Sequence, residues 1–117
     1  MANRLKVLNL TNCLLLESTL DLSAFRSLEI LNFEKCSNLT QFGSSVGGLK
    51  TLICLNLGSC TNLKVLFIEV GILEELKELA MDNTTIELIP KVIGNLKKLE
   101  VLSARGRTNL LNFPQFH

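Results

Sequence analysis

Residues 28–51 read LEILNFEKCSNLTQFGSSVGGLKT, and the rest of the chain is built on the pattern of this stretch. It opens with LxxLxF, places a cysteine eight residues after its first leucine, and continues with regularly spaced apolar residues. Alternate side chains of an extended strand point to the same face, so LxxLxF has the spacing of a strand with one buried face. The stretch therefore predicts a short strand, a turn at the cysteine and an apolar return.

The same pattern recurs along the chain at a nearly constant period. Its leading leucines are separated by steps of 23, 24, 24 and 23 residues. The repeats begin at Leu5, Leu28, Leu52, Leu76 and Leu99. A second leucine follows three residues after each of these, and the period lies in the range of leucine-rich repeats. We predict an α/β repeat fold over residues 1–117. It is a single leucine-rich repeat solenoid of about five coils, with a parallel β-sheet on the concave face and short 3₁₀ or helical returns on the convex face.

Composition narrows the classes of partner. Apolar residues make up 47% of the chain but aromatic residues only 5%, which predicts a core of stacked aliphatic side chains. The net charge of +1 gives no electrostatic case for nucleic acid or an anionic membrane as a partner. No apolar run has the length of a signal peptide or a membrane-spanning helix, so we expect a cytoplasmic location.

The cysteines follow the repeat. Cys13, Cys36 and Cys60 stand at the same position in successive coils, which predicts a ladder of small, inward-facing side chains. Their spacing matches neither zinc-binding cysteine pairs nor a compact disulfide framework, so we expect no metal and no cofactor. Cys54 falls on an outward position of the third strand. We expect it to be the one thiol that meets solvent, and to be chemically inert.

The repeats resemble the leucine-rich region of plant intracellular nucleotide-binding immune receptors, especially those with an N-terminal TIR domain. The likeness lies in residues 5–39 and 76–102, and it is most specific where residues 84–96 match the return T-x-I-x-x-L-P-x-x-I-G-x-L of that family. The matching residues there are Thr84, Ile86, Ile89, Pro90, Ile93, Gly94 and Leu96. The resemblance implies a non-catalytic protein-recognition module that senses a pathogen effector or keeps its own receptor inactive. The chain departs from the whole receptor because it contains no GxxxxGK[ST] loop.

The outward strand positions form two columns from coil to coil. One column is apolar and is interrupted by Glu78, while the other is made of asparagines, whose amides we expect to hydrogen-bond to one another along the ladder. Acidic side chains in the middle coils and Arg105 and Arg107 at the end predict a charge gradient that would orient a partner. The candidate protein-binding residues are Val7, Asn9, Ile30, Asn32, Glu34, Cys54, Asn56, Glu78, Asp82, Val101 and Arg105. The apolar column is read either as a binding strip or as ordinary coverage of the sheet edge.

Other readings of the sequence remain open. Glu34, Glu78 and Asp82 are carboxylates that an enzyme would use as acid and base, but the single histidine is the last residue, so we expect no catalysis. The substrate-recruiting repeat of a ubiquitin-ligase complex is the alternative function. Neither end of the array carries a polar cap, which leads us to expect either a piece of a longer array or self-association through its ends.

Overall fold

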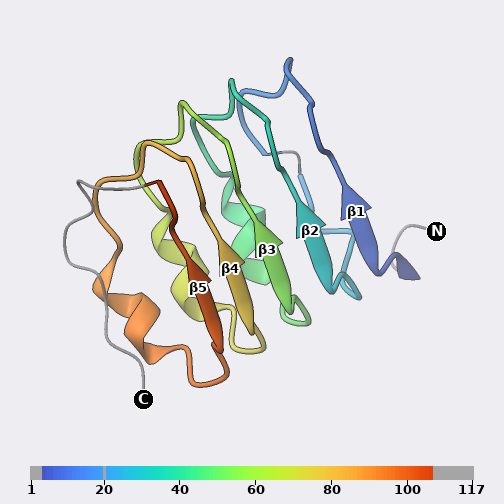
Figure 1. The fold of residues 1–117 in the computed structure, drawn as a ribbon. Coiled ribbons are helices and arrows are strands. Elements are labelled where there is room, and N and C mark those ends of the chain that lie inside the picture. The colour runs from blue at the N-terminus through green and yellow to red at the C-terminus, as the bar shows by residue number, and fades with distance from the viewer. Residues whose placement is uncertain (1–3, 20, 107–117) are drawn as a thin grey trace.

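The computed structural model describes residues 4–19 and 21–106. The strands are β1 (Val7–Asn9), β2 (Ile30–Asn32), β3 (Cys54–Asn56), β4 (Glu78–Ala80) and β5 (Val101–Ser103). They form one five-stranded parallel sheet in the order of the chain (Figure 1). Each strand begins two residues after the leading leucine of its repeat, as the LxxLxL spacing requires.

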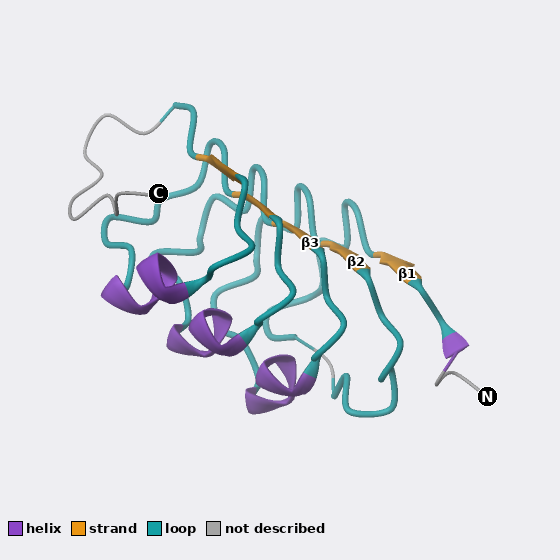
Figure 2. Ribbon diagram, turned by 90° about the horizontal axis from the view of Figure 1, so that it is seen from below, coloured by secondary structure: helices purple, strands orange, loops and turns teal. Residues whose placement is uncertain are grey.

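The returns contain short 3₁₀ helices rather than α-helices. These are η2 (Ser44–Gly48), η3 (Ile68–Ile72) and η4 (Lys91–Asn95). Figure 2 shows the strands along one side of the array and the 3₁₀ helices along the other. The first coil differs, because its residues 21–27 form turns without a 3₁₀ helix. The predicted fold class, a leucine-rich repeat solenoid with a parallel sheet and short returns, is confirmed.

The core is the inward ladder of the repeats. Leu31, Leu55 and Leu79, the middle residues of three adjacent strands, are fully buried and lie in register. Their equivalents in the outer coils, Leu8 and Leu102, are only partly buried. Strands contact only the strands that precede and follow them in sequence, and so do the 3₁₀ helices. Burial is therefore supplied by neighbouring coils, as in other repeat proteins.

Two cysteines of the ladder bond to the coil before them. The thiol of Cys36 donates a hydrogen bond of 3.1 Å to the carbonyl oxygen of Leu10, and that of Cys60 donates one of 3.1 Å to Phe33. Burial raises the pKa of Cys36, and it raises the pKa of Cys60 to about 11. The inward ladder is confirmed for these two. Cys13 is only half-buried because its coil has a neighbour on one side only, so the expectation that Cys54 alone meets solvent was wrong.

In the described part of the chain, the structure contains no helix that is long and apolar enough to cross a membrane.

Candidate protein-binding face of the sheet

The apolar column lies in register across the sheet. Val7 pairs with Ile30, Ile30 with Cys54, Cys54 with Glu78, and Glu78 with Val101. Val7 is 51% exposed, Ile30 41% and Val101 47%, while Cys54 is half-buried. Aliphatic side chains on short strands thus stay in solvent while the residues between them fill the core. We call the outward side of the five strands the sheet face.

Cys54 and Glu78 are in contact across β3 and β4. The Cys54 thiol donates a weak hydrogen bond to Oε2 of Glu78, with 3.7 Å between sulfur and oxygen. Burial, followed by the negative charge and the hydrogen bond of Glu78, raises the pKa of Cys54. At neutral pH the thiol is therefore protonated, which makes it a poor nucleophile and a small apolar group in the column.

The asparagine column works differently from what the sequence led us to expect. Oδ1 of Asn9 accepts a hydrogen bond from the backbone N–H of Thr11 at 3.0 Å, and Oδ1 of Asn32 accepts one from Glu34 at 2.8 Å. Asn56 does the same for Gly58 at 2.8 Å. Each amide oxygen thus binds its own chain two residues on, so the prediction of amides bonded to one another was wrong. Such Asx turns fix the point where the chain leaves a strand.

These turns hold a backbone corner that is repeated in every coil. Three residues after each asparagine position, the backbone has a positive φ, between 56° and 77°. The residues are Asn12, Lys35, Ser59, Asn83 and Gly106. Residues other than glycine rarely adopt this conformation. The asparagines are therefore framework residues that keep the corner in place beside the sheet face.

The asparagine is missing from the fourth and fifth coils, and in the fifth a carboxylate of the fourth coil makes its contact. Ala80 and Ser103 occupy the position of the asparagine. Oδ1 of Asp82 accepts a hydrogen bond of 2.6 Å from the Ser103 hydroxyl and another of 2.6 Å from the backbone N–H of Arg105. Asp82 therefore supports the fifth corner from the coil before it.

Three carboxylates stand in the middle of the sheet face. Glu34 accepts a hydrogen bond of 3.2 Å from the amide of Asn56, while Glu78 is exposed beside Cys54 and Asp82 is half-buried. Within residues 4–19 and 21–106, ion pairs join Lys6 to Glu29 and Lys98 to Glu75, and neither involves these three carboxylates. Arg105 is exposed at the end of the last coil. Arg107 lies outside the described residues.

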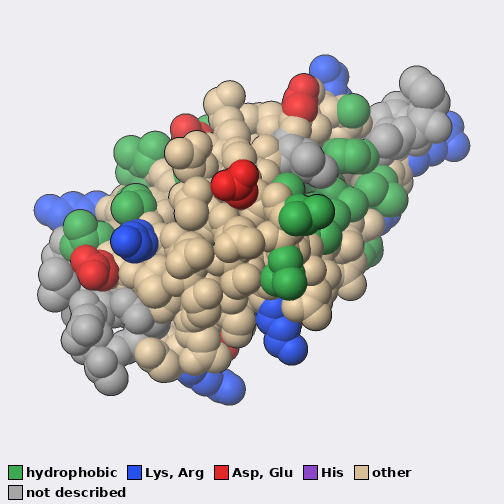
Figure 3. All heavy atoms as spheres, turned by 90° about the horizontal axis from the view of Figure 1, so that it is seen from above, with side chains coloured by type: hydrophobic (Ala, Val, Ile, Leu, Met, Phe, Trp, Pro, Cys, Tyr) green, Lys and Arg blue, Asp and Glu red, His purple; other side chains and the backbone are tan. Residues whose placement is uncertain are grey.

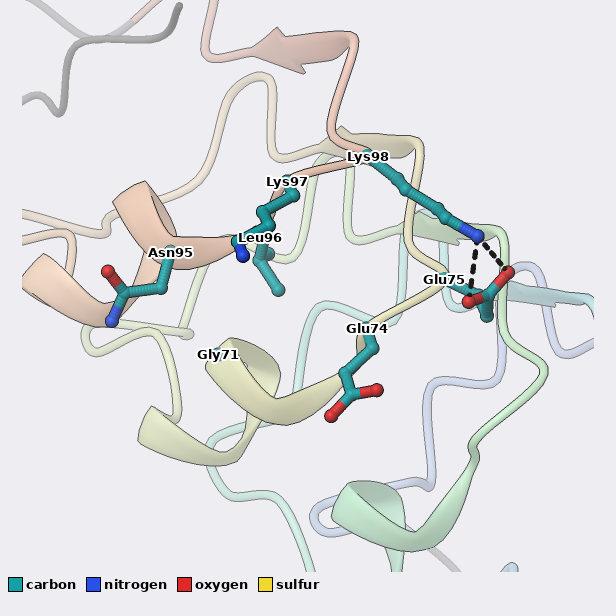
Figure 4. A pocket seen from close by; sticks show the side chains of 7 residues that line it. All are labelled: Gly71, Glu74, Glu75, Asn95, Leu96, Lys97 and Lys98. Atoms are coloured by element: carbon teal, nitrogen blue, oxygen red, sulfur yellow. Dashed lines mark hydrogen bonds and ion pairs between the residues drawn. The ribbon is translucent and has the colours of Figure 1, made fainter.

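Away from the sheet, the described residues line several surface pockets, among them one of about 430 Å³ lined in part by Arg26 and Lys50. A surface pocket of about 380 Å³ lies beside η3 and η4 (Figure 4). Its lining residues are Gly71, Glu74, Glu75, Asn95, Leu96, Lys97 and Lys98. Two Lys98–Glu75 hydrogen bonds, of 2.8 and 3.0 Å, neutralise a charge of each sign in this lining. In the described ranges, no three histidine, cysteine or acidic side chains come together closely enough to hold a metal ion.

An apolar patch at the edge of the array was missed by the sequence reasoning. Leu14 is 53% exposed and Leu15 97%, directly after Cys13. Figure 3, which looks onto the edge where the strands end, shows apolar side chains gathered over the end of the array nearest β1. The signal was present in the repeat alignment, because the equivalent residues of the second coil are Ser37 and Asn38.

Comparison with known proteins places this chain beside plant disease resistance proteins. It is 35% identical over 110 residues to the disease resistance protein RPS4B of Arabidopsis thaliana, covering 94% of this chain and 9% of that protein. It is 32% identical over 96 residues to the disease resistance-like protein DSC1 of the same plant, covering 81% and 8%. Protein SUPPRESSOR OF npr1-1, CONSTITUTIVE 1, also from Arabidopsis thaliana, is 29% identical over 119 residues, covering 85% and 8%.

These matches cover only a small part of each relative. The chain spans less than a tenth of the length of each of the three proteins. No protein-family model matches the sequence. The matches nevertheless run through most of the chain, across the repeats that build the sheet. The chain is thus related in sequence to one short stretch of plant disease resistance proteins.

Proposed function

We propose that the chain is a non-catalytic protein-recognition module that acts in plant innate immunity, in the cytoplasm, and that the sheet face is its binding surface. Its ligand would be a pathogen effector or another domain of the receptor to which the array belongs. The names of the relatives, two of which are a disease resistance protein and a disease resistance-like protein, support the immune setting.

The exposed apolar column carries the proposed mode of binding. Val7, Ile30 and Val101 are each between 41% and 51% exposed on strands whose other face is packed in the core. Contiguous apolar side chains rimmed by polar groups are typical of protein interfaces. The strands already hold these side chains in place, so binding would cost little ordering entropy. The sheet face therefore has both the chemistry and the rigidity that recognition of a protein needs.

Proximity labelling in leaf cells would test this function. The chain would be fused to a biotin ligase and expressed in healthy and infected leaves, and the labelled proteins would be compared with those of two variants. Ile30→Asp with Val101→Asp places charges on the sheet face. Val65→Asp with Leu88→Asp is the matched control, because these residues are 68% and 48% exposed and pair with each other outside the sheet.

We expect a set of labelled proteins that is lost from the sheet-face variant and kept by the control. Thermal melts of both variants would verify that each remains folded. Loss of the same proteins from both variants, or from neither, would overturn the assignment of the sheet face as the binding surface.

A further inference from the structure

We propose that the sheet face binds an amphipathic α-helix of the partner, with aliphatic side chains over Ile30 and Cys54 and a lysine or arginine at Glu78. This inference rests on the proposed function, because it names the kind of partner segment that the same face takes. It follows from the spacing of the column and from its charge.

The spacing of the column is set by the sheet. Ile30, Cys54 and Glu78 are direct partners on three adjacent strands. Neighbouring strands lie about 4.8 Å apart, so the step from Ile30 to Cys54 is about 4.8 Å and that from Ile30 to Glu78 about 10 Å. A partner segment that runs along the column has to present side chains at these two intervals.

A helix meets both intervals and an extended segment does not. A helix rises about 1.5 Å per residue, so side chains at i, i+3 and i+7 lie on one face with separations of about 4.5 and 10.5 Å along its axis. Side chains on one face of an extended segment are about 6.6 Å apart, and the next is at about 13 Å. The register of an extended segment would therefore drift away from the column after the first contact.

The negative charge of the sheet face determines which side chain the partner would place at Glu78. Glu78 is exposed and has no cationic partner among the residues that the structure describes. Asp82, in the same coil as Glu78, and Glu34, in the second coil, add negative charge to the sheet face, and their hydrogen bonds are made to uncharged donors. Glu78 is the one charged residue of the column, and a cation on the partner would neutralise it. An acidic residue there would add like-charge repulsion.

The hydrogen bond between Cys54 and Glu78 favours the same arrangement. It holds the carboxylate of Glu78 beside the apolar part of the column formed by Ile30 and Cys54, with 3.7 Å between Sγ and Oε2. A lysine or arginine has an aliphatic stem as well as a charged head. Its stem would cover Cys54 while its head reaches Glu78, so a single side chain would satisfy both parts of the surface.

Peptide display would test the inference with defined probes. Two libraries of about 14 residues, or four helical turns, would be selected against the immobilised chain, one on a helix-stabilised scaffold and one of linear, unstructured peptides. Both would be counter-selected against the Ile30→Asp variant, so that only peptides that need the apolar column survive. If thermal melting shows that Ile30→Asp is unfolded, Ile30→Ser would replace it.

Charge reversal then separates the proposed contact from a general electrostatic effect. Glu78→Lys and Glu74→Lys change the net charge equally, and both glutamates are exposed. Glu74 lines the pocket beside η3, where Figure 4 shows its carboxylate pointing away from the Lys98–Glu75 pair. We expect surviving peptides to bind Glu78→Lys about tenfold more weakly than the unmodified chain, and to bind Glu74→Lys within about twofold.

The outcomes distinguish this inference from the proposed function. Helical peptides with aliphatic residues at i and i+3 or i+4, and a lysine or arginine at i+7, would support the inference. Surviving peptides that are linear, that lack the cation, or that respond equally to both charge reversals would overturn it and leave the proposed function standing. If no peptide depends on Ile30, the inference fails, while proximity labelling with the Ile30→Asp and Val101→Asp variant decides the proposed function separately.

Discussion

Ser103 donates a hydrogen bond of 2.6 Å from its hydroxyl group to Oδ1 of Asp82, which belongs to the preceding coil. The same oxygen accepts the backbone N–H of Arg105 at 2.6 Å. In the first three coils this backbone contact is made by the asparagine of the coil itself. Asp82 is therefore a substitute for a missing asparagine, and the substitution joins the last two coils.

Removal of that carboxylate should loosen the fifth corner. We expect Asp82→Ala to lower the free energy of unfolding by about 1–3 kcal/mol, because two hydrogen bonds to a charged acceptor are lost. Ser103→Asn in the same variant should restore about 1 kcal/mol by giving Arg105 the contact that Asn32 gives Glu34. Urea unfolding of the three proteins would measure both effects. Failure of the second change to restore stability would show that the corner is not held by an Asx turn.

Because its leucines are buried, the central coil should be sensitive to the replacement of a large inward side chain by a small one. Leu55 is fully buried, and Leu55→Ala should cost about 2–5 kcal/mol because it leaves a cavity between two neighbouring coils. Lys97 is exposed, and Lys97→Ala should change stability by less than about 0.5 kcal/mol. Thermal melting would compare them. Equal shifts in melting temperature would contradict the inward orientation of Leu55.

The 3₁₀ helices pack closely at one glycine and loosely at another. A Cβ atom added to Gly71 would overlap Cγ2 of Val92 and lie 2.7 Å from its Cβ, whereas one added to the equivalent Gly94 would meet no atom within 4 Å. We expect Gly71→Ala to destabilise the chain by about 1–3 kcal/mol through overpacking. Gly94→Ala should be neutral or stabilise it by up to about 1 kcal/mol. Denaturant titration of the pair would show whether η3 and η4 are in contact in solution.

The thiols should differ in reactivity. Cys54 is half-buried, while Cys36 and Cys60 are buried, so a maleimide should label Cys54 well before those two in the native protein. Glu78→Gln should make Cys54 react faster at neutral pH, because the negative charge that helps to raise its pKa is removed and more thiolate forms. Mass spectrometry of digested protein would locate the adducts. Prompt labelling of Cys36 would contradict the inward ladder, and half-buried Cys13, like Cys54, should react before the two buried thiols.

The exposed leucines after Cys13 should promote self-association. We expect oligomers at about tens of micromolar in sedimentation experiments, since Leu14 and Leu15 add apolar surface to a first coil that is only half-covered. Leu14→Ser with Leu15→Asn gives the first coil the residues of the second, Ser37 and Asn38, and should shift the protein towards monomers. Val65→Ser is the control at another exposed aliphatic residue. An equal effect of the two variants would rule out a specific role for the leucine pair.

The strand register was predictable from the sequence because one inward leucine per repeat determines it. Once Leu31, Leu55 and Leu79 are stacked, the side-chain alternation of a strand leaves no choice for Ile30, Cys54 and Glu78. The short returns were predictable for a similar reason, since few residues separate Gly43 from the next leading leucine. Both features depend on period and spacing, which a single sequence contains.

The asparagine column was misread because spacing alone does not say which atoms a polar side chain meets. Asn32 lies in register with Asn56, yet its oxygen binds the N–H of Glu34. The contact of Asp82 with Ser103 depends on side-chain rotamers, which no repeat pattern encodes. Similarly, the rings of Phe42 and Phe67 stack with centroids 4.0 Å apart, although their repeats align them only approximately.

The alternation of inward and outward residues within each strand has a consequence for how such an array evolves. A codon change at Ile30 or Glu78 alters the chemistry of the exposed sheet face, while the neighbouring Leu31 and Leu79 continue to hold the coil together. Because each strand touches only its neighbours, the effect of such a change stays local. Natural selection can therefore change the surface chemistry of the sheet face one residue at a time without a loss of folding.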